Sequence, residues 1–261
     1  MMDKLNVFLK PLVPFLSVAY SMAVIYVTAL PVAGDNPGFC GELLTWLFTL
    51  AGIVLSLFLV GRVEPKMFPA AGRFPLKLPK FPLVAGLLLI APLWLVVEGY
   101  IVYGITSLAH SIQMEPLAYT TADLRKDLLS SVHAVLLAPV LEELCFRQMA
   151  ISPFRRRGAQ IIVCVVMAVL FGILHVRNFP GAFLGAIVYG LVFIWSRNIW
   201  CGVAFHAGRN LAVTLLMLYS WLGLGDMQMA KIPVIFLPDS KVLLASVVFA
   251  AAGVWVIKRK R

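Results

Sequence analysis

The chain has 261 residues, of which 61% are hydrophobic and only 13% are charged, and its formal net charge is +10. Its mean hydropathy is +0.94, whereas a soluble globular domain carries about 45–50% apolar and about 25% charged residues. These values exclude a disordered chain, a collagen, a disulfide scaffold and an ordinary soluble domain. We therefore expect an integral membrane protein, and we interpret its basic residues as signals of membrane orientation rather than as a nucleic-acid surface.

Apolar stretches of about 17–25 residues predict transmembrane helices, and the chain offers eight candidates. The first is too long, at about 23 residues, for the apolar core of a signal peptide, which measures about 7–15 residues, so we expect it to be retained. The sixth is short and the third is long enough to extend beyond the membrane surface. In chain order the eight are Pro11–Ala33, Leu43–Gly61, Phe81–Ala109, Leu128–Ala150, Ala159–Val176, Gly181–Ser196, Ile199–Trp221 and Val242–Ile257.

The basic residues divide unevenly between the two sides of such a bundle. With the N-terminus in the cytoplasm, fifteen Lys and Arg residues fall on the cytoplasmic side and five on the other, as the positive-inside rule requires. Eight spans then place both termini in the cytoplasm. The proline-rich stretch Arg62–Lys80 is typical of an inner loop on the lipid headgroups. We expect residues 1–261 to form one all-α, polytopic membrane domain, located in the inner membrane if the source is bacterial.

Ionisable side chains lie inside several of these apolar stretches. Each costs about 2.5–3.5 kcal/mol on insertion scales, so each is a functional-site hypothesis. A helix bundle would bury such groups by turning them toward one another or toward water. They are Glu98 in the third span, Glu142, Glu143 and Arg147 in the fourth, His175 in the fifth, and His206 and Arg209 in the seventh, where the neutral amide of Asn210 adds a further polar group.

Helical spacing separates the two adjacent glutamates. Glu143 and Arg147 are at positions i and i+4, with the glutamate on the N-terminal side, which favours an ion pair. Glu142 points about 100° away around the axis, so the two carboxyl groups are not expected to share a proton. Glu142 is therefore the carboxylate left to face another partner.

The histidines also occur at helical spacing with a second group. His206 and Asn210 are at i and i+4, and so are Phe171 and His175, where we expect the ring of Phe171 to pack beneath the imidazole. A desolvated glutamate can take a proton from water, a histidine can hold that water or protonate a leaving amine, and a His/Asn pair can donate hydrogen bonds to an oxyanion. The parts are those of a hydrolase.

Three motifs in this order resemble the CPBP family, which contains the type II CAAX prenyl proteases and the bacteriocin-processing (Abi) enzymes. They are Glu-Glu-x-x-x-Arg at 142–147, Phe-x-x-x-His at 171–175 and His-x-x-x-Asn at 206–210. The resemblance covers about Ser131–Leu215, within a motif-bearing core of about 128–221. Many members have Gly after the arginine, where this chain has Gln148, a departure that bears on packing more than on chemistry.

The resemblance implies a glutamate-dependent intramembrane protease that works without a metal or other cofactor. Glu142 and His175 would activate water, and His206 and Asn210 would form the oxyanion site. Glu143 and Arg147 would support them. The substrate would be a membrane-associated or lipid-modified protein or peptide, cleaved near its C-terminus, and its identity is left open.

Other interpretations of the same residues remain. Glu142, His175 and His206 could form a zinc site of the His₂Glu type, although the H-E-x-x-H spacing is missing. For Arg209 we expect a structural role, with Glu98 across the helices as a candidate partner, and a direct role at the substrate is the alternative. The sequence leaves open whether the two residues pair.

Remaining polar groups have simpler interpretations. We expect His110 and His133 to be interfacial groups. Cys40, Cys145, Cys164 and Cys201 form no C-x-x-C pair, and we expect Cys145 to serve in packing.

Two rival functions are a non-enzymatic immunity or scaffold protein and a small proton-coupled transporter.

One feature conflicts with a simple layout of straight helices. Counting at about 1.5 Å per residue, Glu142 lies near the inner end of its span and His175 near the outer end of the next, about 15 Å apart in depth. We therefore predict either a kink at Pro139 or an inward dip of the turn at Arg155–Arg157.

Overall fold

A computed structural model describes residues 38–63, 76–109, 113–116, 121–225, 228–231 and 234–259 of the chain. Within these ranges, six helices are long and apolar enough to cross a membrane. The first expected span, most of the Arg62–Lys80 loop and His110 lie outside the described residues. The count of eight spans and the cytoplasmic position of both termini therefore stay predictions.

The six long helices follow six of the expected spans closely. Helix α3 is followed directly by the π-helical segment η2, and together they contain the stretch Leu43–Gly61. The other expected spans agree with their helices to within about two residues at most ends. The six long helices are α3 (Gly38–Phe58), α5 (Phe81–Ala109), α8 (Arg157–Leu174), α9 (Phe179–Ser196), α10 (Ile199–Trp221) and α11 (Ser240–Arg259), and η2 (Leu59–Val63) continues α3.

The fourth expected span, Leu128–Ala150, is not one regular helix. It is divided into α6 (Thr121–Leu136), α7 (Ala138–Glu143) and the π-helical segment η3 (Leu144–Met149). The break falls at Leu137, just before Pro139, whose nitrogen cannot donate the next helical hydrogen bond. A deformation at Pro139, one of the two predicted alternatives, is therefore present.

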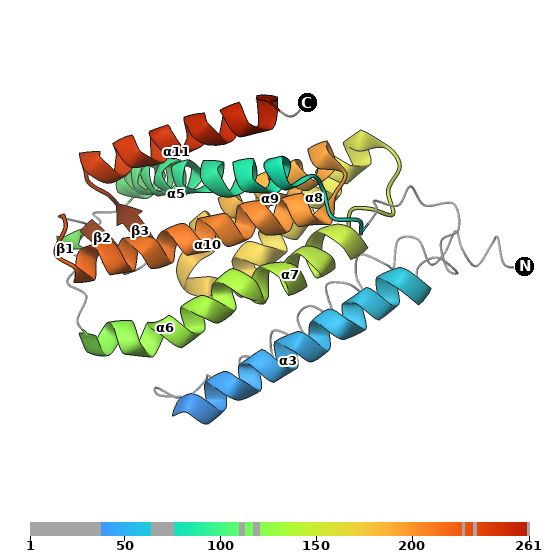
Figure 1. The fold of residues 1–261 in the computed structure, drawn as a ribbon, viewed down its shortest axis with the longest axis horizontal. Helices are drawn as coiled ribbons and strands as arrows, with labels where there is room; N and C mark the ends of the chain where they lie inside the picture. The colour runs from blue at the N-terminus through green and yellow to red at the C-terminus, as the bar shows by residue number, and fades with distance from the viewer. Residues whose placement is uncertain are drawn as a thin grey trace, which may run out of the picture.

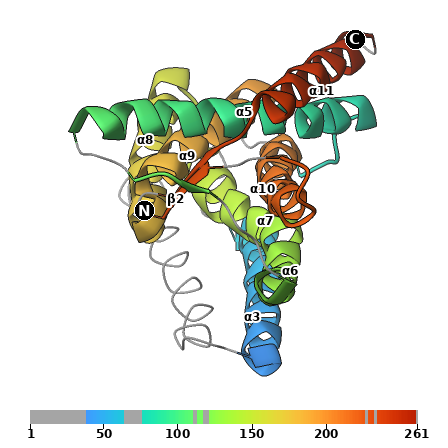
Figure 2. The ribbon, with the colours of Figure 1, turned by 90° about the vertical axis from the view of Figure 1, so that its left-hand side faces the viewer.

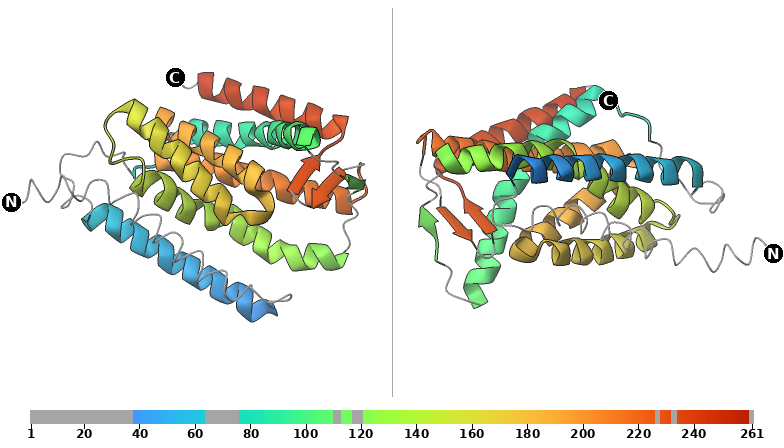
Figure 3. Two further views of the ribbon diagram at one scale, coloured as in Figure 1. Left: turned by 180° about the vertical axis from the view of Figure 1, so that it is seen from behind. Right: turned by 90° about the horizontal axis from the view of Figure 1, so that it is seen from below.

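The all-α prediction missed a small antiparallel sheet. Its strands are β1 (Glu115–Pro116), β2 (Gln228–Lys231) and β3 (Val234–Leu237), in the order β1-β2-β3. Strands β2 and β3 pair in register from Gln228 opposite Leu237 to Lys231 opposite Val234. The strands lie at the end of the bundle where α10 ends and α11 begins (Figure 3).

Helix α5 lies across three other helices of the bundle. Helix α5 contacts α9, α10 and α11, while α8 pairs with α9 and α10 also contacts α6 and α9. Figure 1 shows α6 and α7 as one bent rod between α3 and α10, and Figure 2 shows α5 crossing the other helices at a steep angle. Helices α5 and α10 cross closely at Gly208, where an added Cβ would lie only 2.9 Å from the Cβ of Ala91 in α5.

Candidate active site

A buried ion pair lies in the bent rod at the junction of α7 and η3. Arg147 Nη1 lies 3.2 Å from Glu143 Oε1, and the side chains are only 2% and 0% exposed. Arg147 Nη2 donates a hydrogen bond of 3.0 Å to the carbonyl of Ala186 in α9. The rings of Phe171 and Tyr189 lie 5.3 and 5.6 Å from the guanidinium carbon, within the range of cation–π attraction. The ion pair predicted from the i, i+4 spacing is present.

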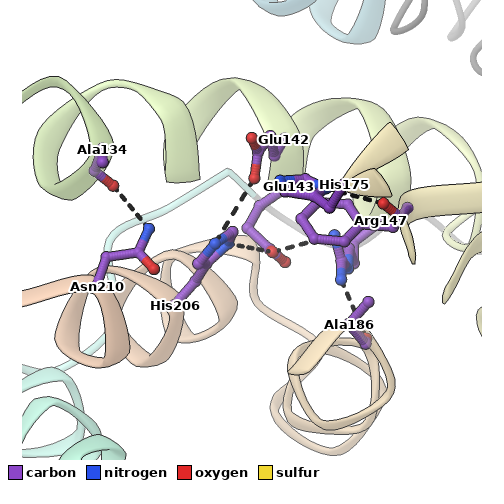
Figure 4. Close-up of polar contacts among 9 residues, drawn as sticks. Ala134, Glu142, Glu143, Arg147, His175, Ala186, His206 and Asn210 are labelled. Atoms are coloured by element: carbon purple, nitrogen blue, oxygen red, sulfur yellow. Dashed lines mark hydrogen bonds and ion pairs between the residues drawn. The ribbon is translucent and has the colours of Figure 1, made fainter. Parts of the chain in front are cut away.

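His206 of α10 lies between the two glutamates (Figure 4). Its Nδ1 lies 3.1 Å from Glu143 Oε1, and its Nε2 lies 3.6 Å from Glu142 Oε2. The ring of Tyr189 stacks on the imidazole, with 4.2 Å between ring centroids and 17° between planes. The partner that the sequence left open for Glu142 is therefore His206, and the two glutamates, although they face different ways, meet the same imidazole from its two nitrogens.

His175 is held at the C-terminal end of α8. Its Nδ1 lies 2.8 Å from the carbonyl oxygen of Phe171, and because a carbonyl can only accept, Nδ1 carries the hydrogen and donates it. The imidazole stacks on the Phe171 ring at 4.4 Å, as the i, i+4 spacing predicts. The neutral ring therefore keeps Nε2 as a free proton acceptor.

Asn210 is oriented by the bent rod. Its Nδ2 donates a hydrogen bond of 2.8 Å to the carbonyl of Ala134 in α6. This contact fixes the amide plane, because the amide oxygen could not serve at that position. One hydrogen of Nδ2 and the carbonyl oxygen remain for other partners.

A single cavity of about 460 Å³ joins these groups. It is bordered by the side chains that the sequence singles out on three separate helices: Glu142, His175, His206 and Asn210. The side chain of Glu142 is 14% exposed, and the cavity has ample room for water molecules. Glu142 and His175 border the same space, so the difference in depth expected from straight helices does not keep them apart.

The bent rod presents a stripe of small residues to this cavity. Ser130, Ala134 and Ala138 precede Glu142 at intervals of four residues, and all line the cavity. Their small side chains leave the space open on one face of the rod. Together they extend the cavity along about three helical turns away from Glu142.

Arg209 and Glu98 form a second buried ion pair beside the cavity, which answers a question that the sequence left open. Arg209 Nη2 donates to Glu98 Oε1, and this contact links α10 to α5. Gly181 of α9 leaves room for it, because a Cβ there would lie 2.8 Å from Glu98 Oε1. Arg209 lines the cavity, so the arginine of this pair forms part of the cavity wall.

Sequence reasoning missed two residues of this site. The expected interfacial role of His133 is incomplete, because His133 lines the cavity and its Nε2 lies 2.9 Å from the hydroxyl of Thr49 in α3. Tyr189, which stacks on His206, carries no sequence signal of its own. His133 lies about two and a half turns from Glu142, which in a regular helix places the two residues on opposite faces, so helical spacing could not reveal it. Tyr189 has the spacing of an ordinary core residue.

The sequence also raised a metal site and a role for Cys145. Within the described ranges, no group of three or more His, Cys, Asp and Glu side chains is arranged to hold a metal ion. Cys145 is buried in the core, with its Sγ 3.8 Å from the hydroxyl of Ser56. This environment agrees with the packing role expected for it.

The fold and the cavity define a helical membrane protein with a buried cluster of carboxylates, histidines and an amide. Residues 125–212 match the sequence model of the Rce1-like family, described as type II CAAX prenyl endopeptidase Rce1-like. The resemblance predicted from the three motifs is confirmed over this segment, which is about a third of the chain and contains all three motifs. The match supports, in general terms, an intramembrane endopeptidase of the CAAX type. No curated protein and no solved structure matches the chain.

Proposed function

We propose that this protein is a glutamate-dependent intramembrane endopeptidase that hydrolyses a peptide bond near the C-terminus of a membrane-associated or lipid-modified protein. The observation that carries the proposal is the shared cavity. Glu142, His175, His206 and Asn210 come from three parts of the sequence and border one space of about 460 Å³. Oriented polar groups in an apolar bundle are what hydrolysis within a membrane requires.

The nucleophile in this proposal is a water molecule held between Glu142 and His175. Glu142 takes a proton from the water, and the free Nε2 of His175 accepts a hydrogen bond from it and orients it. The water oxygen then attacks the carbonyl carbon of the substrate. Glu142 is the carboxylate suited to this role, because Glu143 is fully buried and paired with Arg147.

The oxyanion formed by that attack needs hydrogen-bond donors. Asn210 can supply the second hydrogen of Nδ2, since the first is held by the carbonyl of Ala134. His206 supplies a donor when its Nε2 is protonated. Each such donor in a water-poor site contributes about 3–4 kcal/mol to transition-state stabilisation. The C–N bond breaks when the leaving amine receives the proton that the attacking water lost.

The substitution Glu142→Gln tests the proposal in purified protein reconstituted into liposomes with lipid-modified peptides. The amide cannot take a proton from water, so we expect cleavage to fall by at least about 10³-fold while the melting temperature stays close to that of the parent. Glu115→Gln is the matched control, because Glu115 is an exposed residue of β1 and is not among the residues that line the cavity. This control variant should cleave normally.

The same variant separates the proposal from its two rivals. A scaffold or immunity protein would lose abundance or stability on Glu142→Gln and would show no product in any form. A proton-coupled transporter would carry flux driven by a pH gradient across the liposome without any cleaved product. Either result would overturn the proposal.

A further inference from the structure

The contacts of His206 suggest a function for Glu143 beyond neutralising Arg147. We propose that Glu143 is a positioning residue that holds His206 in the Nδ1–H form and stabilises its positive charge when Nε2 receives a proton. This inference rests on the proposed function and concerns the same cavity. It gives the second glutamate of the adjacent pair a role that acts through the histidine.

The tautomer follows from which atoms face each other. Glu143 Oε1 lies 3.1 Å from His206 Nδ1, and the same oxygen lies 3.2 Å from Arg147 Nη1. The guanidinium of Arg147 can only donate, so Glu143 meets it as a carboxylate, and a carboxylate can only accept a hydrogen bond. His206 must therefore carry a hydrogen on Nδ1, which leaves Nε2 as the nitrogen that faces Glu142 and the cavity.

The two histidines of the cavity differ in what holds their Nδ1 atoms. His175 donates from Nδ1 to the neutral carbonyl of Phe171, whereas His206 donates to a carboxylate. A carboxylate partner fixes the ring and favours the imidazolium form, as the buried acidic residue does in hydrolytic triads. His206 is therefore the histidine of the cavity whose Nδ1 partner is a carboxylate.

This arrangement gives the proton of the attacking water a complete route. The proton moves from water to Glu142 and then across the 3.6 Å contact from Glu142 Oε2 to His206 Nε2, with a small movement to bring the two atoms within hydrogen-bond distance. The new Nε2–H serves the oxyanion while the intermediate exists. It then passes to the leaving amine as the C–N bond breaks, which restores the neutral His206. No other reactant is needed.

The surroundings of Glu143 hold the carboxylate in place. Its side chain is fully buried, and Oε2 packs against Gly202, where a Cβ would lie at 2.7 Å. Tyr189 covers one face of the His206 ring, and Arg209, three residues further along α10, is already engaged by Glu98. The charged groups that meet the imidazole through its nitrogens are therefore the two glutamates.

Two variants separate the orienting role of Glu143 from its charge. In Glu143→Gln the amide oxygen can occupy the Oε1 position and keep both contacts, so we expect the Nδ1–H tautomer to persist while kcat falls on the order of 10²-fold with KM nearly unchanged. The double variant Glu143→Met with Arg147→Met removes the carboxylate that accepts from His206 Nδ1. It also removes Arg147, so that the guanidinium is not left buried without its partner. There we expect His206 to change to the Nε2–H tautomer.

Nitrogen-15 NMR of labelled histidine in bilayers measures the tautomer without any substrate. The chain has only four histidines, and His206→Gln assigns the relevant signal. At about pH 8, where an ordinary imidazole is neutral, the parent should show a protonated Nδ1 and a bare Nε2 for His206, and His175 serves as the internal control. A parent His206 with a bare Nδ1, or a tautomer that is unchanged in the double methionine variant, would overturn the inference.

Kinetics test whether Glu143 acts through the histidine. In a His206→Gln background, Glu143→Gln should cost less than about threefold in kcat, because the residue through which it acts is gone. Fully additive losses would refute the positioning role. This failure is distinct from failure of the proposed function, which would appear as normal cleavage by Glu142→Gln, and the NMR result stands even if either variant is too unstable for kinetics.

Discussion

Replacing Gly202 by alanine should disturb the proposed active site without touching any group proposed to react. A Cβ at this position would lie 2.7 Å from Glu143 Oε2, whereas nine in ten Cβ contacts are no shorter than 3.4 Å. The carboxylate must therefore retreat by about 0.7 Å. Because its other oxygen holds both His206 and Arg147, the retreat weakens a hydrogen bond between charged or polarised groups, which is a loss of about 1.5–3 kcal/mol.

That loss corresponds to about a tenfold to hundredfold decrease in cleavage rate. The matched control is Gly104→Ala in α5, where a Cβ meets no heavy atom within 4 Å. Alanine is favoured over glycine inside a helix by about 0.5–1 kcal/mol, so the control should melt slightly higher and cleave normally. Cleavage is measured in liposomes and stability by thermal unfolding in detergent. If Gly202→Ala is as active and as stable as Gly104→Ala, the reasoning from the Glu143 contacts is wrong.

Three further outcomes are expected. Exhaustive chelation should leave cleavage unchanged, and activity restored only by added zinc would favour the His₂Glu alternative. Glu98→Gln should lower the free energy of unfolding by about 3–5 kcal/mol because it strands the buried Arg209 charge, and Glu98→Leu with Arg209→Met should recover most of this loss; a double variant as unstable as the single one would contradict the ion-pair argument. Although partial burial favours the neutral form, hydrogen bonds from the Val242 N–H and the Tyr219 hydroxyl lower the pKa of Asp239 below its ordinary value. The contribution of Asp239 to the free energy of unfolding should be complete above the ordinary pKa of aspartate and should be lost as the pH falls through the lower pKa of the folded state. The difference in melting temperature between the parent and Asp239→Ala should therefore be smaller at about pH 3 than at about pH 6.

Much of the architecture follows from periodicity and apolar length. Six expected spans appear as helices with nearly the expected ends, because a membrane requires each spanning segment to satisfy its own backbone hydrogen bonds. The ion pair of Glu143 with Arg147 was also predictable, and Glu98 was a candidate partner for Arg209. The first depends on local spacing, and the second on the cost of leaving an intramembrane charge without a partner.

The rest depends on tertiary contacts that local spacing does not encode. The proline at position 139 predicted a deformation of the helix. Only the packed structure places the break at Leu137 and shows that a π-helical segment follows α7. The histidine that meets Glu142 is set by how α10 lies against the bent rod, so the sequence could not distinguish His206 from His175. The sheet was missed because its strands have at most four residues, too few for a period of two to be recognised.

The most direct test of the account compares the C-termini of membrane proteins in cells that carry either the parent protein or Glu142→Gln at equal abundance. Quantitative mass spectrometry reports each C-terminus directly and works without a substrate chosen in advance. If Glu142 activates water, one or a few membrane-associated proteins are shortened at the C-terminus with the parent and full-length with Glu142→Gln. Identical C-termini in the two strains, with both proteins folded and inserted, would contradict the claim that Glu142 activates water for peptide hydrolysis within the membrane.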